Sequence, residues 1–190
     1  MAFKNFSDVL TFTSRFFSKP RFTGSILPSS RFLGNKMAYL AALDPQKITI
    51  ELGPGTGAIT GRLIKCGVPQ HNLYCVEFDG KLCEIVRRKF PETNVINASA
   101  ENLREIFGNK TPQIGAIVSS LPLLSLPRET VEKILFEIQE VLPKGARFVQ
   151  FTYKLNRDPN CVGLAKMRHV GCAKVYLNFP PARVDAFEKI

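Results

Sequence analysis

The sequence predicts an α/β fold in which a mostly parallel sheet is covered by helices on both faces. Three observations lead to this prediction. From Ile48 onward, short apolar runs alternate with segments of helical periodicity, which is typical of a parallel sheet with helical crossovers. A glycine-rich turn, Gly53–Gly57, joins the first apolar run to the first helical segment. The last two apolar runs are joined by a short proline turn, which favours an antiparallel pair at one edge.

Each expected element follows from the spacing of its apolar residues. Strands buried on both faces of a sheet are continuous apolar runs, whereas helices carry apolar residues three or four positions apart. Pro159 and Gly163 lie between the fifth and sixth strands, so a helix there must be short. The last two strands meet at the turn Pro180–Pro181. The expected strands are Ile48–Leu52, Asn72–Phe78, Thr93–Asn97, Ile114–Ser119, Arg147–Tyr153, Cys172–Phe179 and Val184–Ile190. The expected helices are Thr56–Cys66, Gly80–Phe90, Ala100–Phe107 and Arg128–Leu142.

The composition is that of a folded chain with one main domain. Its 190 residues are 45% hydrophobic and 22% charged, which suffices for a core and excludes a disordered chain. No run approaches the roughly 18 apolar residues of a membrane span, and no secretory signal is recognisable, so we expect a cytoplasmic protein. Five cysteines without a C-x-x-C spacing indicate neither a disulfide framework nor a metal site. We expect a monomer without a metal.

Positive charge gathers at both ends of the chain. The net charge is +10. Residues 1–40 carry six Lys or Arg against one acid, and residues 144–190 carry nine against three. Residues 41–143 are nearly neutral, with eleven against twelve. Basic flanks that meet in space form a patch for an anionic partner, either nucleic acid or an anionic membrane surface.

Residues 1–40 are expected to form a basic, helical N-terminal segment, and residues 41–190 the main domain. The start of this segment mixes aromatic and basic residues. That composition is typical of a helix that lies on a membrane, and a helix packed on the core is an equal alternative. The residues concerned are Phe3, Phe6, Leu10, Phe16 and Phe17 on one helical face, with Arg15 and Lys19 among them.

The turn after the first strand has the composition of a ligand-binding loop. It consists of Glu51-Leu-Gly53-Pro54-Gly55-Thr-Gly57, between an expected strand and an expected helix. Its glycines allow a sharp turn and a close approach of the backbone to a ligand. The spacing differs from the G-x-G-x-x-G of dinucleotide sites, and Glu51 would attract an ammonium group but repel a pyrophosphate. These two details favour S-adenosylmethionine (SAM) over a dinucleotide.

The ends of the second and third strands are expected to supply further cofactor contacts. Glu77 lies twenty residues beyond Gly57, where a carboxylate accepts hydrogen bonds from both hydroxyls of a ribose. Phe78 beside it can pack on the adenine. Ser99 and Ala100 should border the adenine, with Ser99 either bonding its exocyclic amine or forming a simple turn.

The fourth strand ends where the methyl donor is expected. The segment Ser119-Ser-Leu121-Pro122-Leu-Leu carries neither a carboxylate nor a histidine. We expect Ser119 to border the cofactor, and Ser119, Leu121 and Pro122 to shape the place of transfer. Direct displacement at a sulfonium needs mainly approach and alignment, so the absence of a base in this segment is tolerable. Candidate helpers elsewhere are Tyr153, Tyr39 and His169.

Five segments occur in the same order as in a known family. From about residue 10 to its end, the chain resembles the bacterial phospholipid N-methyltransferases of the soluble, peripheral-membrane type, which are class I SAM-dependent methyltransferases. The resemblance implies a Rossmann-like seven-stranded sheet preceded by N-terminal helices, and SAM as cofactor. It also implies methylation of phosphatidylethanolamine toward phosphatidylcholine at the inner face of the membrane. The segments are Pro28-Ser-Ser-Arg31, Glu51–Gly57, Ser119–Pro127, Gln150-Phe-Thr-Tyr153 and Asn178-Phe-Pro-Pro-Ala182.

The resemblance also implies an amphipathic N-terminal helix on anionic membrane and contacts to a phospholipid substrate. Aromatic faces hold a cationic ammonium, and Arg or Lys binds a phosphate. Relatives usually have Gly-Asp at Ala98-Ser99, so this chain lacks a carboxylate that they place near the adenine. The candidates are Phe22, Tyr39 and Tyr153 for the ammonium, and Arg183 or Lys154 for the phosphate.

An rRNA adenine dimethyltransferase is the alternative, because that family shares the fold and a similar glycine loop, and basic flanks suit RNA. Those enzymes have N-L-P-Y or a close variant after the fourth strand, and its aromatic ring stacks on the flipped base. Here Ser119 or Ser120 and Leu123 occupy these positions, and Leu123 cannot stack. We also expect no helical RNA-binding domain after Ile190. A second alternative is a SAM-binding protein without catalytic activity.

Overall fold

Seven strands form one sheet in the order β3-β2-β1-β4-β5-β7-β6. The computed structural model describes residues 30–156 and 163–190. The first five strands, β1 to β5, run parallel to one another, and β7 runs antiparallel to both β5 and β6. The predicted sheet, mostly parallel with an antiparallel C-terminal pair, is therefore confirmed. The strands are β1 Ile48–Leu52, β2 Leu73–Glu77, β3 Asn94–Asn97, β4 Ile114–Ser119, β5 Arg147–Thr152, β6 Met167–Val175 and β7 Ala182–Lys189.

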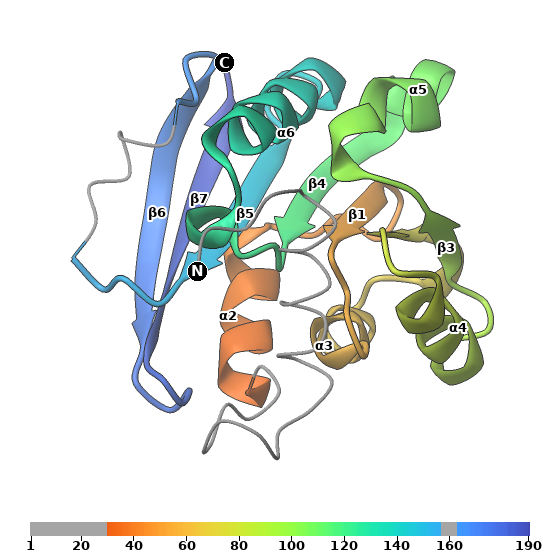
Figure 1. Cartoon of the computed structure of the whole chain (residues 1–190), viewed down its shortest axis with the longest axis horizontal. Helices are drawn as coiled ribbons and strands as arrows, with labels where there is room; N and C mark the ends of the chain where they lie inside the picture. Colours follow the sequence, from red (N-terminus) through yellow and green to blue (C-terminus); the bar gives the residue numbers. More distant parts are fainter. Residues whose placement is uncertain (1–29, 157–162) are drawn as a thin grey trace.

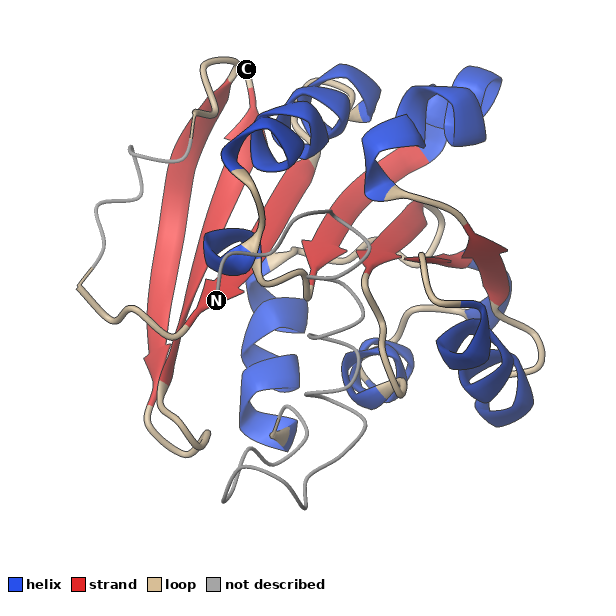
Figure 2. Ribbon diagram, viewed as in Figure 1, coloured by secondary structure: helices blue, strands red, loops and turns tan. Residues whose placement is uncertain are grey.

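Helices cover both faces of this sheet (Figure 1, Figure 2). Helices α2, α3 and α4 lie on one face, and α5 and α6 lie on the other. Each helix turns its apolar residues, which recur three or four positions apart, toward the sheet. The helices are α2 Arg31–Leu40, α3 Ala58–Lys65, α4 Gly80–Lys89, α5 Leu103–Phe107 and α6 Arg128–Val141.

Each face of the sheet has its own hydrophobic core. Ile50 and Phe148 belong to the core under α5 and α6, whereas Val118 and Val149 belong to the core under α2 and α3. Successive side chains of a strand point to opposite faces. Glu51, which follows Ile50 in β1, therefore lies on the α2–α3 side.

The closing hairpin differs from the prediction at its turn. β6, Met167–Val175, begins five residues earlier than predicted and ends before Phe179, and β7 begins at Ala182. The loop that connects the two strands is thus longer than the predicted turn Pro180–Pro181. The prediction of a strand through Phe179 was wrong because the Asn178 side chain bonds to the backbone outside the sheet, which takes this apolar run out of strand pairing.

Two helix predictions also change in detail. The predicted helix Ala100–Phe107 divides into a short 3₁₀ turn, Ala100–Asn102, followed by α5. Ser99 caps this turn by accepting a hydrogen bond from the amide of Glu101. A short helix was predicted between β5 and β6, and the described parts of that connection, residues 153–156 and 163–166, contain none.

The described part of the N-terminal segment packs on the sheet. Ser30 caps α2 by accepting a hydrogen bond from the amide of Leu33, and Leu33, Met37 and Ala38 are buried in the core under α2 and α3. The predicted membrane-facing positions Phe3, Phe6, Leu10, Arg15, Phe16, Phe17 and Lys19, and the ammonium candidate Phe22, lie outside the described residues.

Candidate cofactor and acceptor site

The strand order reverses between β1 and β4, because β2 continues from one side of β1 and β4 lies on the other. Ligands of open α/β sheets bind at the carboxyl ends of the strands beside such a reversal. Two backbone hydrogen bonds fix this position. The amide of Gly53 donates to the carbonyl of Val76 at 3.0 Å, and the amide of Ser120 donates to the carbonyl of Leu52 at 2.8 Å. The glycine loop and the end of β4 are thereby held side by side.

Three glycines of the loop adopt backbone angles that other residues rarely adopt. Gly53, Gly55 and Gly57 have φ of 67°, 58° and 85°. A Cβ on Gly53 would lie 2.7 Å from a side-chain atom of Leu121, and one on Gly57 would lie 2.7 Å from the ring of Phe90. A Cβ on Gly55 would meet no atom within 4 Å. Gly53 and Gly57 are required by packing, whereas Gly55 borders open space where a ligand can approach.

Glu77, at the end of β2, holds the loop in place. Its Oε2 accepts a hydrogen bond from the amide of Gly55 at 3.1 Å, and its Oε1 accepts one from the amide of Asp79 at 3.0 Å. Burial raises the pKa of Glu77, and these two backbone donors oppose part of that rise. Each carboxylate oxygen can accept a second hydrogen bond. The predicted contact to a ribose is thus compatible with the bracing of the loop.

Glu51 is completely buried at the base of the loop. Its Oε2 accepts a weak hydrogen bond from Sγ of Cys75 at 3.6 Å, and its Oε1 has no partner with good hydrogen-bond geometry. Burial raises the pKa of Glu51 from 4.5 to about 7, although the neighbouring Thr60 and Cys75 lower it in part. A buried carboxylate with an unsatisfied oxygen is poised to accept a cationic donor.

On the expected adenine side of the site, the ends of β2 and β3 are held together, but the Ser99 hydroxyl is already engaged with Glu101. The side-chain Nδ2 of Asn97 donates to the backbone carbonyls of Glu77 and Phe78, which ties the ends of β2 and β3 together. Phe78 is exposed beside them, and Ala100 is buried. The hydroxyl of Ser99 is engaged locally with Glu101, both through the cap and through a 3.1 Å contact to its carboxylate.

The end of β4 forms a tight apolar turn. Ser119 is fully buried, and its Oγ accepts a hydrogen bond from the amide of Leu121 at 3.3 Å. The carbonyl of Leu121 accepts a hydrogen bond from the side-chain amide of Gln150 at 3.0 Å. Pro122 follows and leads into a 3₁₀ turn, Leu123–Ser125. Ser119 and Leu121 contact each other within this turn, whereas Pro122 and Tyr153, which were also predicted to act in transfer, line the pocket described next.

A largely apolar pocket of about 930 Å³ opens between this turn, α6 and the sheet. Its floor includes Gln150 of β5 and Phe187 of β7, and Tyr153 and Lys154 line it just beyond the end of β5. One end of the pocket lies at the carboxyl end of β5, beside Pro122 in the turn after β4, and the residues of the glycine loop do not line it. The pocket is large enough for an extended apolar ligand.

A carboxylate missed by the sequence analysis also lines this pocket. Oδ1 of Asp185 accepts hydrogen bonds from Nε and Nη2 of Arg183 at 3.0 and 2.8 Å, and Nε2 of His169 lies 3.0 Å away. Among the described residues, nothing donates to its Oδ2. Asp185 pairs across the strands with Gln150, whose buried Oε1 also has no donor. The floor of an apolar pocket therefore presents two acceptor groups.

The sequence contained a signal for Asp185. In β7, alternation places Arg183, Asp185 and Phe187 on one face, and the intervening Val184 and Ala186 are buried on the other. A carboxylate on the inward face of a closing strand is unusual enough to be noticed.

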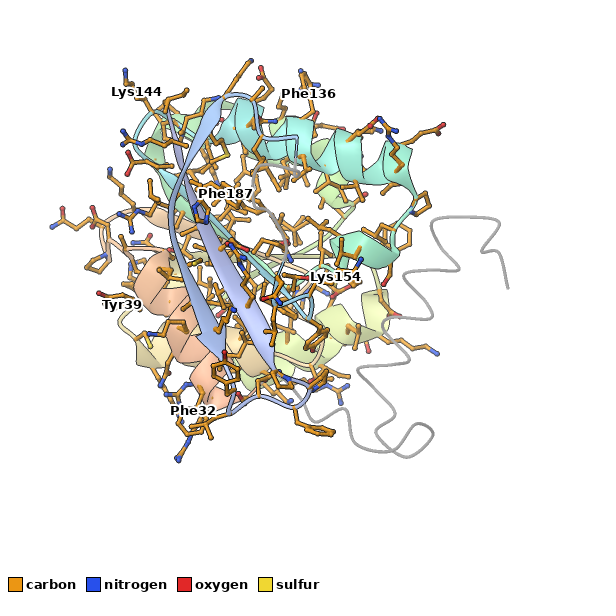
Figure 3. All side chains as sticks on the ribbon, turned by 90° about the vertical axis from the view of Figure 1, so that its left-hand side faces the viewer. Phe32, Tyr39, Phe136, Lys144, Lys154 and Phe187 are labelled. Atoms are coloured by element: carbon orange, nitrogen blue, oxygen red, sulfur yellow. The ribbon has the colours of Figure 1, made fainter. Side chains whose placement is uncertain are left out.

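Of the other residues predicted to contact the acceptor, some line the pocket and others lie away from it. Tyr153 lines the pocket, and burial raises the pKa of its hydroxyl, against a smaller effect of its hydrogen bond to Asn178. Tyr39 is exposed on α2, and its ring contacts the ammonium of Lys36. Arg183, a phosphate candidate, is engaged with Asp185, and its side chain is mostly buried. Figure 3 shows Lys154 near the sheet and Tyr39 out on α2.

The residues around the loop fit SAM. Gly55 leaves room for close approach, Glu77 offers acceptors for two hydroxyls, and Glu51 offers an unsatisfied buried carboxylate to an ammonium group. Within residues 30–156 and 163–190, no group of three His, Cys, Asp or Glu could hold a metal ion. In the same ranges, no helix has the length and apolar character needed to cross a bilayer.

Comparison with solved structures confirms the fold. The chain resembles TrmN of Thermus thermophilus with a TM-score of 0.67 and 20% identity, over 93% of this chain and 53% of that one. It also resembles the N-methyltransferase NodS of Bradyrhizobium japonicum, which was solved with S-adenosylhomocysteine. The TM-score is 0.67 and the identity 11%, over 95% of this chain and 98% of NodS. The fold is shared with solved methyltransferases, one of which has S-adenosylhomocysteine bound, and this supports SAM as the cofactor.

Comparison with curated sequences gives two kinds of relative. An ornithine lipid N-methyltransferase of Singulisphaera acidiphila is 26% identical over 149 residues, which cover 76% of this chain and 78% of that protein. A ribosomal RNA small subunit methyltransferase A of Chlorobium limicola is 29% identical over 59% of this chain but only 39% of that protein. No family model matches the chain. The lipid relative agrees with the expected likeness to lipid N-methyltransferases.

Proposed function

We propose that the protein is a SAM-dependent N-methyltransferase whose acceptor is the amine of a membrane lipid, with phosphatidylethanolamine the expected acceptor. The observation that carries the proposal is the apolar pocket with acceptor groups on its floor, one end of which lies at the carboxyl end of β5 beside Pro122. An acyl chain fits the apolar lining, and an amine fits Asp185 and Gln150. The ornithine lipid relative, which is matched over most of its length, supports an amine-bearing lipid.

The cofactor side rests on three residues of this chain. Gly55 allows the ligand to approach the loop, Glu77 accepts hydrogen bonds from the ribose, and Glu51 receives an ammonium group. When bound, SAM supplies a methyl group on a positively charged sulfur, and that sulfur leaves as part of a neutral thioether. Pro122 and Leu123, which line the pocket in the apolar turn after β4, exclude water from the place where the nitrogen approaches.

The acceptor side must bind an ammonium and remove a proton from it. Asp185 attracts the ammonium, because its Oδ2 accepts no other described donor. One proton passes from the nitrogen to this carboxylate, and the partly exposed His169, with its Nε2 3.0 Å from Oδ1, is the neighbouring group that can take it up. The neutral nitrogen then forms the new bond to carbon while the carbon–sulfur bond breaks. Asp185 thus supplies the base that the end of β4 lacks.

The rRNA adenine alternative is less well supported by the site. Leu123 is buried in the turn, and no aromatic ring follows Pro122 to stack on a flipped base. The rRNA relatives are matched over less than half of their own length. A non-catalytic SAM-binding protein remains the second alternative, and it predicts an inert acceptor pocket.

Expression in a bacterial host without methylated lipids tests the proposal. Mass spectrometry of the lipid extract should show methylated phosphatidylethanolamine, or methylated ornithine lipid where the host makes it. The Gly55→Asp variant, which blocks the cofactor loop, is the matched control and should show neither. A lipid extract identical to that of the control would contradict the proposal.

A further inference from the structure

The turn between β6 and β7 exposes large apolar side chains. Tyr176, Leu177 and Phe179 are 67%, 69% and 59% exposed. Phe32, at the start of α2, is exposed at the same end of the molecule, opposite to Lys144 (Figure 3). We call residues 176–179 the hairpin tip. Exposing three such side chains within four positions costs solvation free energy unless a partner covers them.

The hairpin tip is held rigidly by Asn178, which is buried between the exposed residues. Its Oδ1 accepts a hydrogen bond from the amide of Ser30 at 2.9 Å, and its Nδ2 donates to the carbonyl of Pro180 at 2.7 Å. These contacts join the tip to the N-terminus of α2. The apolar side chains are therefore presented outward by a fixed backbone, and no ordering of the tip is needed when a partner covers it.

The surroundings of the tip carry positive charge without acids. Of the described residues, those adjoining the tip in the chain or in the structure, 30–32, 153–156 and 172–184, include no Asp or Glu. Arg31 lies over the ring of Phe32 at 4.8 Å, and Lys174 adjoins the tip in β6. Lys154 is exposed beyond β5. An apolar tip ringed by cations is complementary to an anionic bilayer, whose headgroups are negative and whose interior is apolar.

We propose that the hairpin tip inserts into the headgroup region of an anionic membrane and docks the enzyme there. The inference rests on the proposed function, because it identifies the surface through which a lipid methyltransferase would meet its substrate. Tyr176, Leu177 and Phe179 enter the boundary between headgroups and acyl chains. Arg31, Lys154 and Lys174 contact anionic headgroups.

The position of the tip fits delivery of a lipid to the pocket. The tip follows the strand end at which Thr152 pairs with Arg183, the same end at which β5 opens into the pocket. Tyr153, which lines the pocket, interacts with Asn178 of the tip. A membrane that covers the tip is therefore close to Tyr153 and Lys154 at the pocket. A lipid can move into the pocket with little of its acyl chain exposed to water.

Vesicle co-sedimentation of the full chain without SAM tests the docking surface. The Leu177→Asp, Phe179→Asp double variant should bind phosphatidylglycerol vesicles about tenfold more weakly or worse, because two inserted apolar side chains become charged. The control is Ile190→Asp, which also changes a 59% exposed apolar residue but lies at the opposite end of β7. It should bind like the unmodified chain. Equal vesicle binding by the double variant and the unmodified chain would overturn the proposal.

Fluorescence gives a second measurement that does not depend on a disruptive change. The chain contains no tryptophan, so a single Tyr176→Trp variant reports only on the tip. Its emission should shift to the blue with phosphatidylglycerol vesicles, be quenched by brominated lipid, and respond less in high salt. The Ile190→Trp variant should do none of these. A tip tryptophan that stays in water on vesicles, or that is shielded only by ribosomal RNA, overturns the proposal.

The vesicle and fluorescence results are separate from the proposed catalytic activity. A tip that inserts while no lipid is methylated leaves the docking surface standing and removes the proposed function. Lipid methylation by a protein whose tip never inserts would support the proposed function and overturn the docking surface.

Discussion

The carboxylate of Glu77 accepts a hydrogen bond from the amide of Gly55, 22 positions away in the chain, at 3.1 Å. This contact joins the end of β2 to the middle of the cofactor loop. The loop is therefore preformed by a residue that also faces the expected ribose. Holding the loop and binding the cofactor are coupled through one side chain.

Glu77→Gln should weaken SAM binding by about tenfold or more. The neutral side chain can accept from one of the two backbone amides, Gly55 or Asp79, but its own NH₂ group must face the other. Calorimetric titration with SAM measures the effect. Asp79→Asn is the matched control, because asparagine still caps α4 and the Asp79 carboxylate is engaged with that helix rather than with the loop. Equal affinity of the Glu77→Gln and Asp79→Asn variants for SAM would refute the bracing role.

Gly55→Asp should abolish SAM binding while the chain stays folded. Gly55 and Gly145 both have positive φ, and a Cβ on either meets nothing within 4 Å. Asp at either position therefore adds similar backbone strain, of about 1 kcal/mol. Only Gly55 borders the expected cofactor. Gly145→Asp should lower the melting temperature to a similar extent and bind SAM normally, so a loss of SAM binding in both variants would indicate a general effect of strain.

Glu51→Gln should stabilise the free protein at pH 8 and weaken its binding of SAM. Glu51 has a folded-state pKa of about 7 against an ordinary 4.5, so between these values the folded state holds a proton that the unfolded state has lost. Stability therefore falls as pH rises through this window, by roughly 3 kcal/mol at most. Thermal melts at pH 5 and pH 8 measure this. The gain from the variant should be larger at pH 8.

The same substitution should remove a pH dependence of cofactor binding. An ammonium group beside Glu51 favours its ionised form, so SAM binding releases a proton below pH 7. Affinity should fall by up to about tenfold for each pH unit below 7 in the unmodified chain. In Glu51→Gln this slope should disappear. A slope that persists in the variant would mean that another group titrates with binding.

Asp185→Asn should raise KM for the amine lipid by about tenfold or more, lower kcat because the proposed base is lost, and leave SAM affinity unchanged. The amide oxygen can still accept from Arg183 and His169, so the local structure is retained while the charge is lost. Glu132→Gln is the control, since this carboxylate also lines the pocket but is exposed and paired with Arg128. Methylation kinetics at varied lipid concentration distinguish the two, and equal KM in both variants would exclude Asp185 from the acceptor site.

The alternation of apolar runs and helical segments was sufficient to predict the sheet, because burial on both faces leaves a clear pattern in a parallel strand. The positions of Glu51, Gly55 and Glu77 at strand ends and in the loop were predictable for a related reason, because the glycine spacing and the place after a strand constrain the local backbone. Their contacts to a cofactor stay predictions. The bounds of the turn between β6 and β7 could not be predicted, because they depend on a hydrogen bond between Asn178 and Ser30, 148 positions away. Long-range side-chain contacts of this kind leave no periodic signal.

The acceptor side was less predictable than the cofactor side. Asp185 meets Gln150 and His169 only through the pairing of β5, β7 and β6. The order of strands in an antiparallel edge is not encoded by spacing within any one of them. Ser119 is buried and accepts a hydrogen bond within its own turn, and its predicted place beside the cofactor stays a prediction.

Transfer of label from radioactive SAM to lipid tests the central claim most directly. The unmodified chain would be incubated with anionic vesicles containing phosphatidylethanolamine or ornithine lipid, and with ribosomal RNA in parallel. Label should enter the lipid fraction of at least one vesicle preparation, and Asp185→Asn should reduce it sharply while Glu132→Gln does not. Label in RNA alone, or in no acceptor while SAM binds normally, would contradict the assignment of a lipid amine as the substrate.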